Sequence, residues 1–440
     1  MKKTMCLVLV LLIGISLCGC SRLAELDLPP LPDVDSIREQ QQASQTAPPA
    51  PVETMLPLPS PAPLAAEHVI VNISPYSETF MDPQHGTEAI LDYHYELPVV
   101  YVEGRDQVSN AINEHLAALN ETFHTGNDYG YGTMSGLNMY LEMATDNYTY
   151  MVNTGDTASA SLPYYYGQDV KAVPRADENV LSVLYSTNSF SGGAHGTYVD
   201  RAYCFDTRTG ERITLDMLTP DSEALKSFLQ GYMLSLYEAD EGAYYSERIF
   251  DENFLGAPVS EAVATLIREG SWYLGDSGMV IFSDVYELGP YAAGICEFVV
   301  PYTELAAIID ARWMPTERSG EGSFSVLPQS AVAEGTAQII DRVTVDAEGE
   351  QLCLVAEGRV YDVRISEVSY ADKFYETAQL WACSYMENCL LQLDVTVPEG
   401  IPNLMLRYTD GTGAKYSLLL SRSGVDGGYT LVNDDIEAVG

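Results

Sequence analysis

Basic side chains are scarce in this 440-residue chain. Only 22 lysines and arginines stand against 63 aspartates and glutamates, which gives a formal net charge of −41 at pH 7. Binding to nucleic acid requires lysine and arginine to neutralise phosphates, so the composition argues against a nucleic-acid partner. The same charge attracts cationic partners, although a well-hydrated extracellular surface has a similar composition.

Common catalytic motifs are also absent. The sequence has no Cys-x-x-Cys, His-Glu-x-x-His, Gly-x-Ser-x-Gly or Ser-x-x-Lys motif, and no P-loop or dinucleotide-binding glycine pattern. We therefore expect no catalytic residue of these types, no cofactor and no metal, and a protein that is not an enzyme. A pair of carboxylates in a cleft stays open as an alternative, because spacing cannot single out such a pair among 63 acids.

One long hydrophobic run is present, at the N-terminus. It extends from Met5 to Ile15 behind two lysines, which is typical of a secretory signal and too short for a stable membrane span. The following Leu17-Cys18-Gly19-Cys20 resembles the bacterial lipobox. That resemblance implies a signal peptide over residues 1–19, a lipid on Cys20, and a mature chain on the outer face of the cytoplasmic membrane. An ordinary signal peptide is the alternative.

Two segments poor in aromatic residues divide the rest of the chain. Residues 20–66 are rich in Pro, Ala, Ser and Gln, a composition that cannot bury enough apolar surface to offset the entropy of ordering. We interpret them as a tether and residues 313–335 as a linker. The folded regions are then 67–175, 176–312 and 336–440.

The five cysteines after Cys20 form an odd set, so at least one is free or pairs between molecules. Cys383 and Cys389 are close enough in sequence to bridge in an oxidising exterior. None is clustered with histidines, which argues against a structural zinc site. The five are Cys204, Cys296, Cys353, Cys383 and Cys389.

Hydrophobic periodicity predicts both helices and strands along the chain. In the first region we expect a strand over 89–102, a helix over 106–126, and strands with long loops over 128–167. In the second region the expected strands cover 179–186, 198–205, 272–282 (a hairpin) and 297–301, and the expected helices cover 221–237, 258–269 and 303–309. In the third, short alternating runs over 339–345, 352–356, 361–368, 390–397, 404–408 and 416–420 predict a β-sandwich.

His195 is the histidine with the most distinctive setting. It lies in Gly192-Gly193-Ala194-His195-Gly196, between two predicted strands. The glycines permit positive φ and close backbone approach, so the loop could bind a polar ligand through its amides and imidazole. The other interpretation is a tight connection whose imidazole caps backbone carbonyls, and it is favoured because the histidine has no evident partner acid or nucleophile.

Several motifs in this part of the chain occur in a fixed order. They are Ser191–Gly196, Phe205–Leu215, Trp272–Leu274, Gly278–Phe282, Val285–Gly294 and Phe298–Tyr302. This order resembles the paired extracellular domains of RsiV- and PdaC-type proteins, firmly over 179–306 and more loosely from residue 68. The resemblance implies a PdaC-like α+β domain over 67–175 and an RsiV-like α+β domain over 176–312. It also makes Gly192, Gly193, His195, Tyr286 and Tyr291 candidate binding residues.

The resemblance further implies a binding role at the bacterial envelope, since RsiV-like proteins bind lysozyme and PdaC-like proteins carry a peptidoglycan deacetylase domain. This sequence lacks the deacetylase histidine pair and a membrane-spanning helix with a cytoplasmic segment. We therefore expect a lipid-anchored protein that binds a cationic protein such as lysozyme or a cell-wall glycan (peptidoglycan). A wall hydrolase that uses carboxylates and a structural or assembly lipoprotein are the alternatives.

Overall fold

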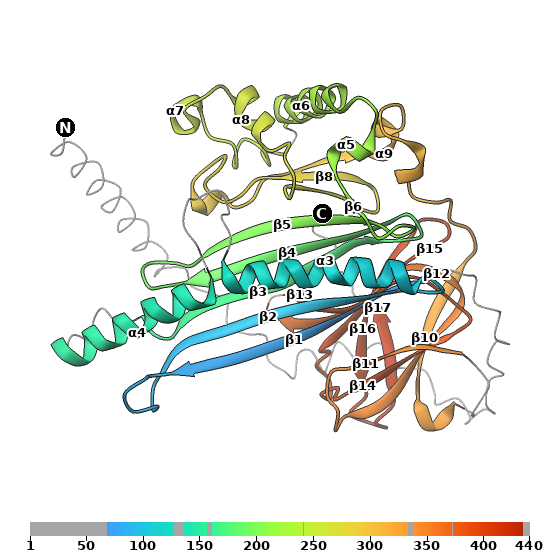
Figure 1. Ribbon diagram of the computed structural model, residues 1–440. Coiled ribbons are helices and arrows are strands. Elements are labelled where there is room, and N and C mark those ends of the chain that lie inside the picture. The colour runs from blue at the N-terminus through green and yellow to red at the C-terminus, as the bar shows by residue number, and fades with distance from the viewer. Residues whose placement is uncertain are drawn as a thin grey trace. The chain divides into compact units, whose positions relative to one another are not determined.

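The computed structural model describes residues 68–126, 136–155, 161–240, 242–332, 338–371 and 373–433 (Figure 1). The expected signal peptide, Cys20 and the whole of the expected tether lie outside these residues. One compact unit, Met55–Ser369 with Phe374–Gly440, contains all the described residues except Tyr370, Ala371 and Lys373. No helix in the described ranges has the length and apolar character needed to cross a bilayer.

A curved sheet of five long strands forms the first half of the fold. The strands are β1 (Val69–Met81), β2 (Ala89–Val102), β3 (Tyr164–Ala176), β4 (Val180–Phe190) and β5 (Thr197–Asp206), with the two-residue β6 (Arg212–Ile213) at the edge. Neighbours pair antiparallel except β2 and β3, which are parallel. The strands predicted around residues 89–102, 179–186 and 198–205 are confirmed.

Two helices cover one face of this sheet (Figure 1). The predicted helix is confirmed as α3 (Asp106–Thr125), which buries its apolar stripe against the sheet. The expectation of strands and loops over 128–167 is wrong for α4 (Leu137–Thr154). That helix buries Tyr140, Ala144 and Tyr148, spaced by four, and ends at the left-handed Gly155.

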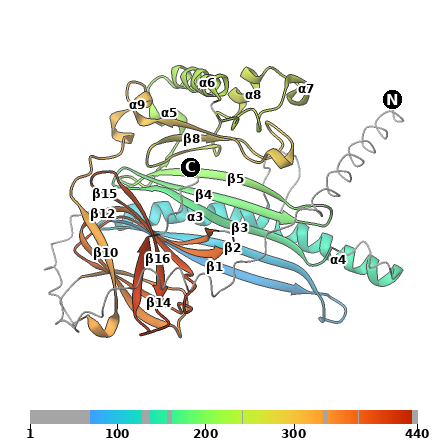
Figure 2. The same ribbon diagram turned by 180° about the vertical axis from the view of Figure 1, so that it is seen from behind.

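The opposite face of the sheet is partly covered by a smaller sheet of β7 (Trp272–Leu274), β8 (Gly278–Phe282) and β9 (Glu297–Pro301), visible from behind in Figure 2. The hairpin and the strand predicted here are confirmed. Further short elements surround this sheet: α5 (Leu215–Leu218), α7 (Glu252–Leu255), η1 (Tyr291–Ala293), α9 (Tyr302–Leu305) and η2 (Ala311–Trp313).

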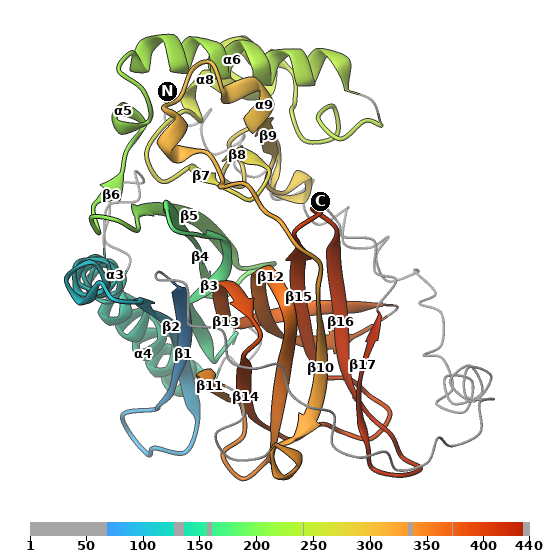
Figure 3. The ribbon, with the colours of Figure 1, turned by 90° about the vertical axis from the view of Figure 1, so that its right-hand side faces the viewer.

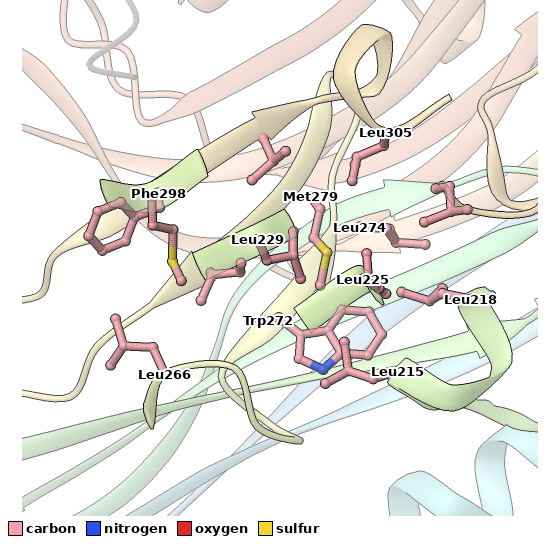
Figure 4. Close-up of a cluster of buried hydrophobic side chains, with 14 of the residues drawn as sticks. Leu215, Leu218, Leu225, Leu229, Leu266, Trp272, Leu274, Met279, Phe298 and Leu305 are labelled. Atoms are coloured by element: carbon pink, nitrogen blue, oxygen red, sulfur yellow. The ribbon is translucent and has the colours of Figure 1, made fainter. Parts of the chain in front are cut away.

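Helices α6 (Ser222–Ala239) and α8 (Val259–Thr265) lie on the outer side of the small sheet. The side chain of Asp221 caps α6 by accepting a hydrogen bond from the amide of Ala224. Leu225 and Leu229 of α6 pack with Trp272, Met279 and other residues into the apolar core shown in Figure 4. Helices predicted over 221–237 and 258–269 are thus confirmed, the second in shorter form.

The C-terminal region is rich in strands (Figure 3), and the α+β fold class is confirmed. It contains β10 (Gly322–Pro328), η3 (Gln329–Ala331), β11 (Ile339–Thr344), β12 (Glu350–Tyr370), β13 (Phe374–Glu387), β14 (Leu390–Val395), β15 (Leu404–Asp410), β16 (Lys415–Arg422) and β17 (Tyr429–Asn433). Two expected strands, over 352–356 and 361–368, are one long strand, β12. Its first half pairs with β10 and β14 and its second half with β15.

Hydrogen bonds join this region to the N-terminal sheet, because β13 pairs antiparallel with β1. The stretch interpreted as a linker contains β10, whose Phe324 packs against Tyr408. Strand β3 ends at Ala176, so its pairing with β4 runs across the boundary expected after residue 175.

The five cysteines expected in the mature chain are all buried and unpaired, so the suggested Cys383–Cys389 bridge is not formed. Cys383 instead donates a hydrogen bond to the carbonyl of Tyr385 at 3.1 Å. Burial raises the pKa of Cys389 to about 11. Both thiols are therefore poorly reactive in the folded protein.

Candidate functional site

The Gly192–Gly196 loop connects β4 to β5, and its glycines are required by the backbone. Gly192 and Gly193 have φ of 90° and 101°, which other residues rarely adopt. A Cβ on Gly196 would lie 2.7 Å from the carbonyl oxygen of Ser189 on the opposite side of the turn. The connection between the strands is therefore tight, as one of the two interpretations of the loop proposed.

His195 lies exposed on this loop and takes part in an aromatic cluster with Tyr286 and Tyr291. Its ring stacks on Tyr291 with centroids 4.0 Å apart, and Tyr286 Oη lies 3.4 Å from His195 Nε2. Nδ1 of His195 faces the carbonyl of Gly196 at 2.7 Å. None of these hydrogen-bond partners among the described residues is a carboxylate, serine or cysteine. The structure thus brings together three of the five candidate binding residues, from segments about 90 positions apart.

Tyr286 is held in an unusual conformation. Its φ is 68°, a strained value for a tyrosine, and 51% of its surface is exposed. Ion pairs fix the residues on both sides of it: Arg201 binds Asp284 through two hydrogen bonds of 2.8 and 3.0 Å, and Arg268 binds Glu287. The tyrosine is therefore positioned by the fold at the surface, with about half of its area exposed.

Tyr198 connects this aromatic cluster to a polar cavity of about 430 Å³ on the sheet face opposite α3 and α4. Its ring meets Tyr291 edge-on at 6.0 Å between centroids. The cavity is within the usual size range of small-molecule sites. It is lined by Glu96, Asp169, Val170, Lys171, Ser186, Tyr198, Glu376, Thr377, Ala378 and Gln379.

Charged and amide groups in the cavity wall are arranged for polar contacts. Lys171 Nζ lies 2.5 Å from the buried carboxylate of Asp200. Gln379 is 7% exposed; its Oε1 accepts a hydrogen bond from the Val173 amide, but its Nε2 has no partner among the described residues. A buried donor without a partner costs free energy.

His94 lies beside the cavity and contacts two of its acids. His94 Nε2 is 3.1 Å from Asp169 Oδ1 and 3.9 Å from Glu96 Oε1. Hydrogen bonding, mainly to Asp169 and to a lesser extent to Glu96, raises the pKa of His94 to about 9. We call these three residues the His94 cluster.

The sequence reasoning missed the cavity and the His94 cluster. A signal was available, because polar residues alternate along the strands: His94 and Glu96 on β2, Asp169 and Lys171 on β3, and Tyr198 and Asp200 on β5. Alternate residues of a strand share one face of a sheet, so this pattern indicates a polar sheet face. The alternation along single strands does not predict the order in which the strands pair, and that order is what places these residues together.

Comparison with known proteins places part of the chain in a family. Residues 218–303 match the family described as a protein of unknown function (DUF3298), and no curated protein matches. A crystal structure of a DUF3298 family member from Bacteroides fragilis is 18% identical, with a TM-score of 0.37, over 55% of this chain and 94% of that chain. A DUF3298 family protein from Pseudomonas aeruginosa PAO1 is 17% identical, with a TM-score of 0.36, over 56% and 97%.

The matched segment includes α6, the small sheet β7–β9, and the aromatic residues Tyr286 and Tyr291. Gly192, Gly193 and His195 lie outside it, on the β4–β5 connection. The aromatic cluster therefore lies where the matched segment meets the N-terminal sheet. This chain contains a DUF3298 domain at residues 218–303.

Proposed function

We propose that this protein is a lipid-anchored binding protein of the bacterial envelope, not an enzyme, and that it binds a cell-wall glycan. The observation that carries the proposal is the stack of exposed His195 on half-buried Tyr291, beside exposed Tyr286 and joined through Tyr198 to the polar cavity. Sugar rings combine apolar faces, which stack on aromatic rings, with hydroxyl groups, which bind carboxylates and amides. The site offers both kinds of surface side by side.

The resemblance over 179–306 supports the envelope location and an RsiV-like assignment, with a PdaC-like region before it. The lipobox supports attachment through Cys20. Replacing Cys20 by serine is expected to release the protein from the membrane fraction into the medium. Retention of the Cys20→Ser variant in the membrane would contradict lipid anchoring at that residue.

Binding to soluble peptidoglycan fragments, measured by calorimetry, tests the glycan proposal. Stacking on an aromatic ring contributes about 0.5–1.5 kcal/mol, so Tyr286→Ala and Tyr291→Ala should each weaken binding roughly twofold to tenfold. Tyr150→Ala is the matched control, because Tyr150 is 53% exposed on α4, outside both the cluster and the cavity lining. No binding by the unmodified protein, or equal binding by all three variants, would refute the proposal. Cleavage of the fragments during the assay would favour the hydrolase alternative.

A cationic protein such as lysozyme is a second candidate partner, favoured by the net charge of −41. Electrostatic attraction over this surface should give association that weakens steeply as salt is added. A lysozyme pull-down across a salt series measures it. Failure to bind lysozyme even at low salt would exclude this partner without affecting the glycan proposal.

A further inference from the structure

The three residues of the His94 cluster come from two adjacent parallel strands. His94 and Glu96 are two positions apart on β2 and therefore share a face of the sheet. Tyr95 pairs with Gln168 on β3, so Glu96 and Asp169 are the next residues along the two strands. Neighbouring strands lie about 4.8 Å apart, which brings all three side chains to one point on the sheet.

The distances within the cluster suit a small cation. Zn²⁺ binds His nitrogen and carboxylate oxygen at about 2.0–2.2 Å, so tetrahedral ligand atoms lie about 3.4 Å from each other. His94 Nε2 lies 3.1 Å from Asp169 Oδ1 and 3.9 Å from Glu96 Oε1, and all three ligand atoms lie within 4.8 Å of one another. Small side-chain rotations are enough to complete three-ligand coordination.

Each residue of the cluster is also fixed through its second polar atom. Ser77 Oγ lies 2.9 Å from His94 Nδ1, and the amide of Val170 donates to Glu96 Oε2 at 2.7 Å. Asn188 Nδ2 donates to Asp169 Oδ2 at 2.8 Å. These outer contacts leave Nε2, Oε1 and Oδ1 directed at one another. Such outer contacts orient the ligands of metal sites and fix the tautomer of a metal-binding histidine.

Two further observations, one on Glu96 and one on the neighbouring cavity wall, bear on a ligand there. Glu96 is 7% exposed, and among the described residues its Oε1 has only the 3.9 Å contact with His94, so this oxygen is available to bind a cation. Gln379, whose Nε2 has no hydrogen-bond partner among the described residues, lines the same cavity as Glu96 and Asp169. The other side of the cluster opens on a second cavity of about 400 Å³, lined by His94 and Asp169.

We propose that His94, Glu96 and Asp169 bind one divalent transition-metal ion, for which Zn²⁺ is the natural probe. One nitrogen and two carboxylate oxygens are the ligand types of open zinc sites, which keep a fourth position for water or another oxygen donor. That fourth position faces the cavities, where the site can accept a hydroxyl or carboxylate oxygen. This inference does not depend on the glycan proposal.

Calorimetric titration of the chelator-treated full chain with Zn²⁺ tests the proposal. We expect one ion per chain. His94→Ala and Asp169→Asn should weaken binding at least a hundredfold, and Ser77→Ala, which removes only an outer contact, roughly tenfold to a hundredfold. His85→Ala is the matched control: His85 lies in the same hairpin beside a carboxylate, with a side chain 65% exposed, outside the cluster, and should bind as the unmodified chain does.

The variants are first compared by circular dichroism, and Ser77→Ala keeps the test informative even if a ligand variant fails to fold. Substoichiometric binding, or equal binding by Ser77→Ala, Asp169→Asn and the unmodified chain, overturns the proposal. Co²⁺ provides a second readout, because sulfur-to-cobalt charge-transfer absorption would place the ion on one of the buried cysteines and overturn the assignment. Displacement of Zn²⁺ by Ca²⁺ would overturn the transition-metal class, since Ca²⁺ prefers all-oxygen sites.

Discussion

Replacing Arg175 by methionine should be among the most damaging single changes outside the apolar cores. Arg175 lies near the end of β3 and is 1% exposed. Its Nε donates to Asp177 Oδ2 at 2.6 Å, and its Nη1 donates to Tyr302 Oη at 2.6 Å and to the Trp313 carbonyl at 2.7 Å. This guanidinium therefore connects the N-terminal sheet to α9 and η2.

The expected loss follows from what remains after the substitution. Removing one partner of a buried ion pair costs about 3–5 kcal/mol, because the other charge stays buried without compensation. Asp177 retains hydrogen bonds from the amides of Asn179 and Val180, and Tyr302 still donates to the carbonyl of Gly275. Because these contacts remain, we expect the free energy of unfolding to decrease by about 3 kcal/mol, the lower end of that range.

Urea unfolding followed by tryptophan fluorescence measures this loss. Arg312→Met is the control, since Arg312 is a partly exposed arginine near the same segment, paired with Asp310, and should change stability by about 0.5 kcal/mol or less. Combining Arg175→Met with Asp177→Asn should recover part of the loss, because the second change removes the uncompensated charge. An Arg175→Met variant within about 1 kcal/mol of the unmodified protein would show that the buried charge network contributes little.

Two other predictions concern single residues. Burial lowers the pKa of His68 despite its hydrogen bond to Glu103, so the folded protein favours the neutral imidazole. The free energy of unfolding should therefore decrease as the pH falls from about 6.5, the ordinary pKa of histidine, to the lowered pKa of His68 in the folded protein. An NMR titration that places the pKa of His68 at or above 6.5 would contradict this. Gly278→Ala should cost about 1–3 kcal/mol, because the added Cβ would lie 2.2 Å from the carbonyl oxygen of Val300 across the β8–β9 pair. Gly231→Ala, at an open position on α6, should instead stabilise by about 0.5–1 kcal/mol in the same unfolding assay; equal effects would rule out the steric explanation.

Local patterns predicted the elements that carry strong periodicity. The α3 stripe with Ile112 and Leu116, and the short β9, were identified from sequence because their apolar spacing matches one type of element. Helix α4 was missed because its buried contacts are made mainly by tyrosines, which favour strands in isolation. Here packing against β2 and β3 overrides that preference.

Long-range pairing was beyond the reach of sequence patterns. Strand β13 pairs with β1 about 300 residues earlier, and β10 was hidden in a segment with linker-like composition. The same limit applies to the site. Glycines around His195 marked the loop, but Tyr198 and the His94 cluster become neighbours only through the order of strands in the sheet.

The β1–β13 pairing has a mechanical consequence. The described chain starts at His68, which is buried and stacked on Tyr385 of β13, and β1 then runs between β2 and β13. A pull on the chain ahead of His68, as a surface anchor would exert, loads β1 along its length. At its start, Ile70–Asn72 pair with β2 on one side and β13 on the other, so a pull along the strand strains both sets of hydrogen bonds at once. The fold is thereby suited to carry tension at the point where a tether would enter it.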